Sequence, residues 1–272
     1  MNNQPKDLET KLAEWVKQEG FPFEMRVARA FQKAGFLITQ SDYYKDPTTS
    51  ASREVDVTAL MNFYIKPIVI RVEFLIECKS SKNKPWVVFC GEQEELEAPA
   101  WVANRFASRA GLKILCDYAG SKEFQSLSLF RLRAPVGYGL QQASIDGKNN
   151  HNQDVAYAAM CGVGNAARAS ADYFRDHLDA SKILEFQFPV IAIEGRLFEC
   201  RLSDNEEIEI KEVSFATLLW NNPIATPVHT LIDVRTDGSI SSFAAECFHG
   251  TQQLLELLSE KVLRTKVLRR EK

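Results

Sequence analysis

The sequence lacks the features of a membrane-spanning or secreted chain. None of its apolar runs approaches the roughly 20 residues that a helix needs to cross a bilayer. The first residues, MNNQPKDLETKLAEW, carry acidic side chains where a signal peptide would have an apolar core. An apolar content of 45% nevertheless allows a sizeable hydrophobic core. We therefore expect a chain that folds on its own, in the cytoplasm, without contact with a membrane.

The residue patterns of zinc and redox sites are missing as well. The six cysteines are scattered, and none has a second cysteine at the C-x-x-C spacing. His151 and His177 stand alone in the sequence. A net charge of −3 argues against a protein that coats nucleic acid through many phosphate contacts. Any contact with nucleic acid must then come from a local basic patch.

The N-terminal part of the chain alternates between helical and extended periodicity. Apolar residues at helical spacing predict one helix after Pro5 and a second over 22–34, which Gly35 ends. The apolar period then changes to that of strands. We expect strands over 36–40, 53–60, 67–79 and 86–90, a helix over 97–110 and a strand over 112–116. This alternation predicts an α/β domain.

The C-terminal part reads as α+β. Glu194-Gly195 has the character of a hairpin turn between two strands. The stretch 133–150, rich in Gly, Gln, Ser and Asn, predicts a boundary between a core at 1–133 and a second region at 134–272; alternatively it is a loop within one continuous sheet. The expected elements are a helix over 151–178, strands over 183–193, 196–202, 207–213 and 227–235, and a C-terminal amphipathic helix.

Two predicted strands carry charged residues whose presence is not explained by packing in an apolar core. Alternation along the strand places Glu54, Asp56 and Thr58 on one face. Val55 and Val57 are then expected on the opposite face. This arrangement predicts that Asp56 lines a polar surface next to the sheet.

The next strand ends in the pair Glu77 and Lys79, which alternation places side by side on one face. If this strand pairs with the preceding one, as sequence neighbours commonly do, Asp56 approaches both residues. Two carboxylates then lie beside an ammonium group. Oxygen ligands of this kind suit Mg²⁺, whose remaining positions are filled by water and phosphate oxygens. Lys79 could orient or deprotonate an attacking water, or stabilise the charged transition state.

This order of elements resembles the PD-(D/E)xK nuclease superfamily, which has the restriction-endonuclease-like fold. The resemblance covers about residues 20–117 and implies a mixed sheet flanked by helices, followed here by a C-terminal α+β extension. It assigns Asp56 and Glu77 as ligands of Mg²⁺ or Mn²⁺, Lys79 as the catalytic lysine and Glu24 as a supplementary acid. The main-chain carbonyl of Cys78 is implied as a further metal ligand. Val55 replaces the proline of the family motif, and no glutamine closely follows Lys79.

The resemblance implies an endonuclease-like hydrolase that cuts phosphodiester bonds, with DNA as the expected partner and a homodimer as a possible assembly. The alternative is a catalytically silent module of the same fold that binds nucleic acid or protein. In the simplest non-catalytic interpretation Asp56 is a surface acid, and Glu77 and Lys79 form an exposed ion pair. Glu24 is then a solvated residue of the first helical turn, where the helix dipole favours an acid. Candidate nucleic-acid contacts are Trp101, Arg105, Arg109, Lys84, Trp86 and the basic tail Lys261, Arg264, Lys266, Arg269 and Arg270.

Overall fold

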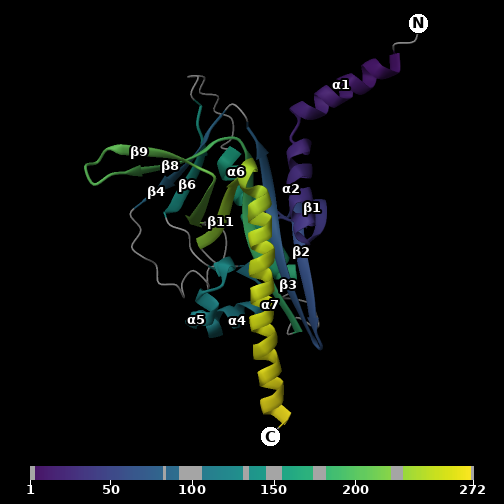
Figure 1. The fold of residues 1–272 in the computed structure, drawn as a ribbon, viewed down its shortest axis with the longest axis vertical. Coiled ribbons are helices and arrows are strands. Elements are labelled where there is room, and N and C mark those ends of the chain that lie inside the picture. The colour runs from purple at the N-terminus through teal and green to yellow at the C-terminus, as the bar shows by residue number, and fades with distance from the viewer. Residues whose placement is uncertain are drawn as a thin grey trace.

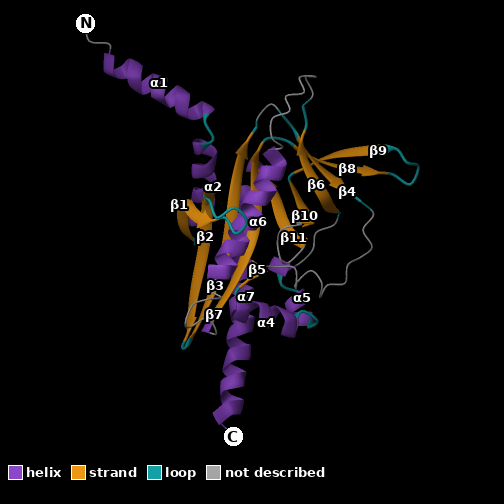
Figure 2. Ribbon diagram, turned by 180° about the vertical axis from the view of Figure 1, so that it is seen from behind, coloured by secondary structure: helices purple, strands orange, loops and turns teal. Residues whose placement is uncertain are grey.

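The structure is a computed structural model, and it describes residues 4–81, 84–91, 106–130, 135–144, 155–173, 182–221 and 229–270. One mixed β-sheet runs through the molecule, with helices on both of its faces (Figures 1 and 2). The chain is therefore an α/β protein, as the sequence predicts. No helix of the described part is long and apolar enough to span a membrane.

The helices of the described residues carry the labels of Figure 1. Helix α1 stands away from the sheet, whereas α2, α6 and α7 pack against it (Figure 1). Their bounds are α1 Gln4–Gln18, α2 Phe21–Ala34, α4 Arg109–Tyr118, α5 Lys122–Gln125, α6 Val155–Tyr173 and α7 Ile240–Arg270, with short 3₁₀ turns at Ser128–Phe130 and Asp237–Ser239.

The strands form a single sheet in the order β1-β2-β3-β7-β11-β10-β6-β4-β8-β9, and the short β5 pairs with β7. The first three strands are antiparallel, while β3, β7 and β11 are parallel to one another. Their bounds are β1 Leu37–Lys45, β2 Ser52–Ile65, β3 Ile68–Ser80, β4 Trp86–Cys90, β5 Phe106–Ala107, β6 Val136–Gln142, β7 Ile183–Glu194, β8 Leu197–Leu202, β9 Ile208–Val213, β10 Phe215–Asn221 and β11 His229–Thr236.

Strands from the two predicted regions are interleaved in this sheet, because β4 of the first region lies between β6 and β8 of the second. β7 lies between β3 and β11, and its pairing with β3 extends over twelve residue pairs from Val69↔Ile183 to Ser80↔Glu194. The predicted boundary at 133–150 contains strand β6, which joins β4 to β10. The sheet is thus continuous through both halves of the chain.

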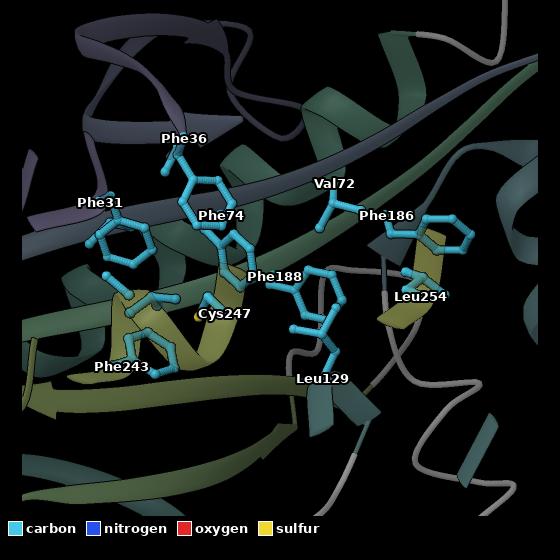
Figure 3. Packing of buried hydrophobic residues seen from close by; sticks show 14 of the residues in the cluster. Phe31, Phe36, Val72, Phe74, Leu129, Phe186, Phe188, Phe243, Cys247 and Leu254 are labelled. Carbon is cyan, nitrogen blue, oxygen red and sulfur yellow. The ribbon is translucent and has the colours of Figure 1, made fainter. Parts of the chain in front are cut away.

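Each face of the sheet has its own hydrophobic core. On one face α2 and α7 pack over aromatic residues, among which Phe74 stacks on Phe188 with ring centroids 5.1 Å apart (Figure 3). Phe31 and Phe243 bring the two helices onto this cluster, with ring centroids 6.1 Å apart. On the other face the alanine-rich α6 packs against strands of both halves. These two layers fix α2 and α6 relative to the central strands.

The predicted strand over 112–116 is wrong, because these residues lie in helix α4. The hydroxyl of Ser108 accepts a hydrogen bond from the Gly111 amide at 3.2 Å and caps this helix. Gly111 and Leu115 are buried one turn apart. A short apolar run fits either period, and here the cap selects the helix. The predicted helix over 97–110 falls largely outside the described residues, and its last part contains β5 and the start of α4.

The predicted hairpin at Glu194-Gly195 is also wrong. Its two strands follow each other in sequence but do not pair, since β7 lies next to β3 and β11, and β8 lies next to β4 and β9. From Leu184 to Ile193 every residue of β7 is buried. Such a run is typical of an internal strand with parallel neighbours, because both faces of the sheet are covered there. Strands of this kind are not joined by a tight hairpin turn.

Candidate active site

The charged residues of the N-terminal strands meet at one end of the sheet. Asp56 lies in β2, Glu77 and Lys79 lie near the end of β3, and Glu24 lies in the first turn of α2. The charges of Asp56, Glu77 and Lys79 all act on Glu24, so the four residues form one electrostatic cluster. The structure therefore brings together all four site residues that the sequence predicts. This end of the sheet also holds the carboxyl ends of the parallel strands β3 and β7, where α/β proteins commonly bind ligands.

Asp56 occupies a break in the strand pairing. The β2–β3 ladder begins at Val57↔Ile76, and the β1–β2 ladder passes from Gln40↔Val57 to Asp42↔Val55 without Asp56. Ser41, the residue skipped on β1, has a positive φ of 53°. In place of a main-chain pair, the Asp56 side chain accepts a hydrogen bond through Oδ2 from the Cys78 amide at 2.6 Å. The aspartate is thus attached directly to the main chain of the strand that carries Glu77 and Lys79.

This break changes the expected facing of the neighbouring valines. Val57 packs with α2 and α7, whereas Val55 belongs to the core beneath α6. The prediction that both valines share a face is therefore wrong, because the regular alternation stops at Asp56. Asp56 itself is only partly exposed.

Lys79 and Glu77 form a close ion pair. The Lys79 Nζ donates to Glu77 Oε1 at 2.5 Å, and the side chains are only 26% and 14% exposed. Burial by itself would lower the pKa of Lys79, but the charge and hydrogen bond of Glu77, followed by the charge of Asp56, raise it above the ordinary value. Burial raises the pKa of Glu77, and Lys79 only partly offsets it. Lys79 is accordingly a cation in the ligand-free protein.

Two further carboxyl groups have raised pKa values. Burial, followed by the charges of Asp56 and Glu54, raises the pKa of Glu24 to about 7. Burial also raises the pKa of Asp56, against the Cys78 hydrogen bond and the charge of Lys79. Like charges held close together and away from water favour protonation. A cluster of this kind would be stabilised by a bound cation, which removes the repulsion.

The oxygen donors at this site are of the type that Mg²⁺ and Mn²⁺ bind. Asp56 Oδ1 and both Glu24 oxygens have no hydrogen-bond partner among the described residues, so they are available as ligands. Within the described part of the chain, no three acidic, histidine or cysteine side chains form a preassembled metal group. Mg²⁺ does not require one, because it commonly takes one or two carboxylates and keeps several waters. Asp56, Glu77 and the Cys78 carbonyl would hold it here.

Two further residues, Glu54 and Tyr44, adjoin the site. Glu54 is exposed beside Asp56, and Tyr44 donates from its hydroxyl to the Gly162 carbonyl of α6 at 3.1 Å. Tyr44 is also close enough to Glu77 for that charge to help raise its pKa, which burial brings to about 12. Strand alternation places Glu54 on the face of Asp56 in the sequence, but nothing in the sequence points to Tyr44. The contact of Tyr44 with α6 joins residues 118 positions apart, and no local pattern predicts it.

A second group of charges holds α2 against the sheet. Arg26 donates to Glu194 Oε1 at 2.5 Å and to Asp237 Oδ2 at 3.4 Å, and Ser80 also donates to Glu194. The end of β3, the end of β7 and the turn before α7 are thereby tied to the helix that carries Glu24. Arg26 is a positioning residue in this arrangement, since two carboxylates already occupy its guanidinium group.

The predicted nucleic-acid contacts receive less support. Arg109 begins α4 next to Ser108, which donates to the Ile183 carbonyl at the start of β7, whereas Lys79 pairs with Ile193 near its end. Ten residues of strand, or about 33 Å, separate these positions. Trp86 is fully buried in the core, and Lys84 is exposed. Trp101 and Arg105 lie outside the described residues, as do the side chains of the basic tail.

Cys78 is not a candidate nucleophile. Its thiol is buried, and burial together with the neighbouring carboxylates raises its pKa well above the ordinary value. A thiol must lose its proton to act as a nucleophile, and this environment opposes that loss. Cys78 acts through its main chain, with the amide bound to Asp56.

Comparison of the chain with protein-family models, with curated proteins and with solved structures gives no match. The functional interpretation therefore depends on the geometry described above.

Proposed function

We propose that this chain is a metal-dependent nuclease of the PD-(D/E)xK type, and that it hydrolyses phosphodiester bonds in DNA. The observation that carries the proposal is the attachment of Asp56 to the Cys78 amide beside the Glu77–Lys79 pair, at 2.6 and 2.5 Å. If Asp56 were only a surface acid and Glu77–Lys79 an unrelated ion pair, nothing would require this hydrogen bond. It runs from the main chain between Glu77 and Lys79 to the Asp56 side chain, at a break in the sheet. The arrangement fits a metal site next to a fixed cation.

The order of elements supports the same proposal. Helix α2 is followed by three antiparallel strands, and α6 later precedes β7, which is parallel to β3. Helices on both faces of this mixed sheet agree with the restriction-endonuclease-like arrangement. The additional strands β4, β6 and β8 to β11 extend the sheet on one side. Of these, β6 and β8 to β11 belong to the expected C-terminal α+β extension, whereas β4 comes from the predicted core at 1–133.

Each side chain has a role that follows from its environment. A divalent metal would supply Lewis acidity and a deprotonated water near the phosphate. Lys79 stays protonated beside Glu77 and is therefore suited to stabilising negative charge on the phosphate rather than to removing a proton. Glu24 has a pKa of about 7 in the metal-free protein, raised by burial and then by the charges of Asp56 and Glu54, and a bound cation would lower it. An unprotonated Glu24 beside the metal would be suited to accept a proton from the attacking water. Its two oxygens are not engaged by other described residues.

The experiment incubates the purified protein with linear duplex, circular duplex and single-stranded DNA, and with RNA. Each substrate is tested with Mg²⁺, with Mn²⁺ and with EDTA. We expect cleavage of DNA that EDTA abolishes. Cleavage that persists in EDTA would contradict the metal site, and binding without cleavage under all conditions would favour a catalytically silent nucleic-acid module.

The chain offers a matched control for this assay. Glu73 lies on β3 four residues before Glu77 and is buried, with Ser170 donating to its Oε2 at 2.6 Å. Glu73→Gln removes a buried carboxylate from the same strand without touching the site. Activity should survive in Glu73→Gln and disappear in Glu77→Gln. Equal loss in both variants would mean that the assay reports general damage to the sheet.

A further inference from the structure

The hairpin of β8 and β9 forms an arm that projects from the body of the molecule (Figures 1 and 2). Its two strands pair in six positions, from Leu197↔Val213 to Leu202↔Ile208. β9 is the last strand in the order of the sheet, and no described strand pairs with its outer side. An exposed strand edge presents main-chain donors and acceptors that another strand can use.

The two faces of this arm differ in chemistry. Towards its tip, one face carries apolar side chains that are largely in solvent, with Leu202 63%, Ile208 70% and Ile210 63% exposed; Glu212 follows them on the same face and pairs with Arg196. The other face carries charges in register, since Arg201 lies opposite Glu209 and Glu199 opposite Lys211. The Arg201–Glu209 ion pair has a distance of 2.8 Å. Exposed isoleucines next to an open strand edge point to an interaction surface.

We propose that the partner of this edge is a second copy of the same chain, whose β9 pairs antiparallel with this β9 about Ile210. In this register Glu209 lies opposite Lys211 of the second copy, and Lys211 opposite its Glu209. Ile210 then lies opposite its own counterpart. Two nearby registers also keep the same faces of the two arms together. The register centred on Glu209 places two glutamates directly opposite each other, and the one centred on Lys211 places two lysines opposite each other. Like charges in such positions destabilise a strand pair.

The charges of the whole arm support this register. The joined arms would form four adjacent strands, and one row of side chains would run across them. This row consists of Arg201 and Glu209 of one copy, followed by Lys211 and Glu199 of the second copy. Their signs alternate from one strand to the next. The first and last pairs of this row already exist within each chain, in the registers Arg201↔Glu209 and Glu199↔Lys211. The same row occurs twice, because a two-fold axis through Ile210 relates the copies.

The test uses charge reversal and mixing, followed by sedimentation velocity over a range of protein concentrations. The wild type should form a dimer. Glu209→Lys places lysine opposite lysine twice, and Lys211→Glu places glutamate opposite glutamate twice. Each variant alone should dissociate at least about tenfold more readily, because two attractions become repulsions. An equal mixture should recover a dimer, since both cross-strand pairs are then of opposite charge.

Matched controls make each outcome decisive. Lys113→Glu reverses an exposed lysine on α4 and should leave the dimer unchanged. Thermal unfolding of every variant shows that the arm variants are folded before mixing. A wild type that stays monomeric at all concentrations would overturn the proposal. So would a dimer that resists both reversals, or a mixture that remains monomeric.

Discussion

The amide of Cys78 donates to Asp56 Oδ2 across 2.6 Å, and this bond joins β2 to β3 at the candidate site, beyond the last main-chain pair of the two strands. It replaces the main-chain pairing that stops at Val57↔Ile76. The bond leaves the second oxygen of Asp56 without a hydrogen bond from the described residues. Replacement of Asp56 therefore has a structural effect and a chemical effect, which different substitutions can separate.

Asp56→Ala should destabilise the protein, whereas Asp56→Asn should not. Alanine leaves the Cys78 amide without its acceptor in a largely buried position, at a cost of about 1–3 kcal/mol in the free energy of unfolding. Asparagine keeps an acceptor oxygen and removes a charge that burial disfavours. Urea denaturation in EDTA measures both. Glu54→Ala, an exposed neighbour, is the control, and equal stability of Asp56→Ala and wild type would argue against the hydrogen bond.

Divalent metal should stabilise the folded protein through Asp56. At a free Mn²⁺ concentration about ten times the dissociation constant, linkage gives ~1.4 kcal/mol and a rise in melting temperature of roughly 3–6 °C. The rise should be smaller in Asp56→Asn, which lacks one of the charges that attract the ion. Glu73→Gln should keep the full rise. Equal shifts in wild type and Asp56→Asn would remove Asp56 from the metal site.

Glu24 should make stability depend on pH. Its pKa is about 7 in the folded protein against an ordinary value of 4.5, owing to burial and the charges of Asp56 and Glu54. The folded state then binds more protons than the unfolded state between these values, so stability falls as pH rises from about 4.5 to about 7. Glu24→Gln should gain stability relative to wild type on going from pH 5 to pH 8 in EDTA.

The control for this pH experiment is Glu19→Gln, which alters an exposed glutamate just before α2. Its difference from wild type should stay constant between the two pH values. If Glu24→Gln behaves in the same way, Glu24 does not belong to the electrostatic cluster of the site.

Gly35 should be intolerant of a side chain. It ends α2 with a positive φ of 112°, and a Cβ built there would lie 2.6 Å from the Phe248 ring of α7. A left-handed conformation costs roughly 1–2 kcal/mol for alanine, and overpacking typically adds about 1–3 kcal/mol. Gly35→Ala should lose about 2–5 kcal/mol in urea denaturation. Gly120→Ala is the control, because no atom lies within 4 Å of a Cβ at that position. A loss below 1 kcal/mol in Gly35→Ala would contradict the packing of α2 against α7.

The sequence predicts the elements whose apolar period is long and regular. The second helix, β3, β4 and β7 appear close to the expected bounds, because burial on one or both faces leaves a clear pattern in the chain. Strand β10 and helix α4 were not expected. In α4, only Gly111 and Leu115 are buried, and so short a pattern does not distinguish a helix from a strand.

The candidate site could be predicted in its residues but not in its geometry. Asp56, Glu77, Lys79 and Glu24 stand out because charged residues interrupt apolar strands or begin a helix. The break at Asp56, the opposite packing of Val55 and Val57, and the contact of Tyr44 with α6 depend on pairing between distant segments. Strand alternation assumes an unbroken ladder of main-chain hydrogen bonds. It therefore cannot predict a position where a side chain, instead of the main chain, accepts the hydrogen bond.

The most direct test of the proposed function is the rate of DNA cleavage under single-turnover conditions in Mg²⁺, compared between wild type, Asp56→Asn, Lys79→Met and Glu73→Gln. All four proteins should be folded, because Asp56→Asn keeps the acceptor for Cys78 and Lys79 is partly exposed. We expect wild type and Glu73→Gln to cut DNA at similar rates, and the two site variants to lose at least about 100-fold, the scale of a lost transition-state contact. Cleavage by Asp56→Asn or Lys79→Met at the wild-type rate would contradict the assignment of this site.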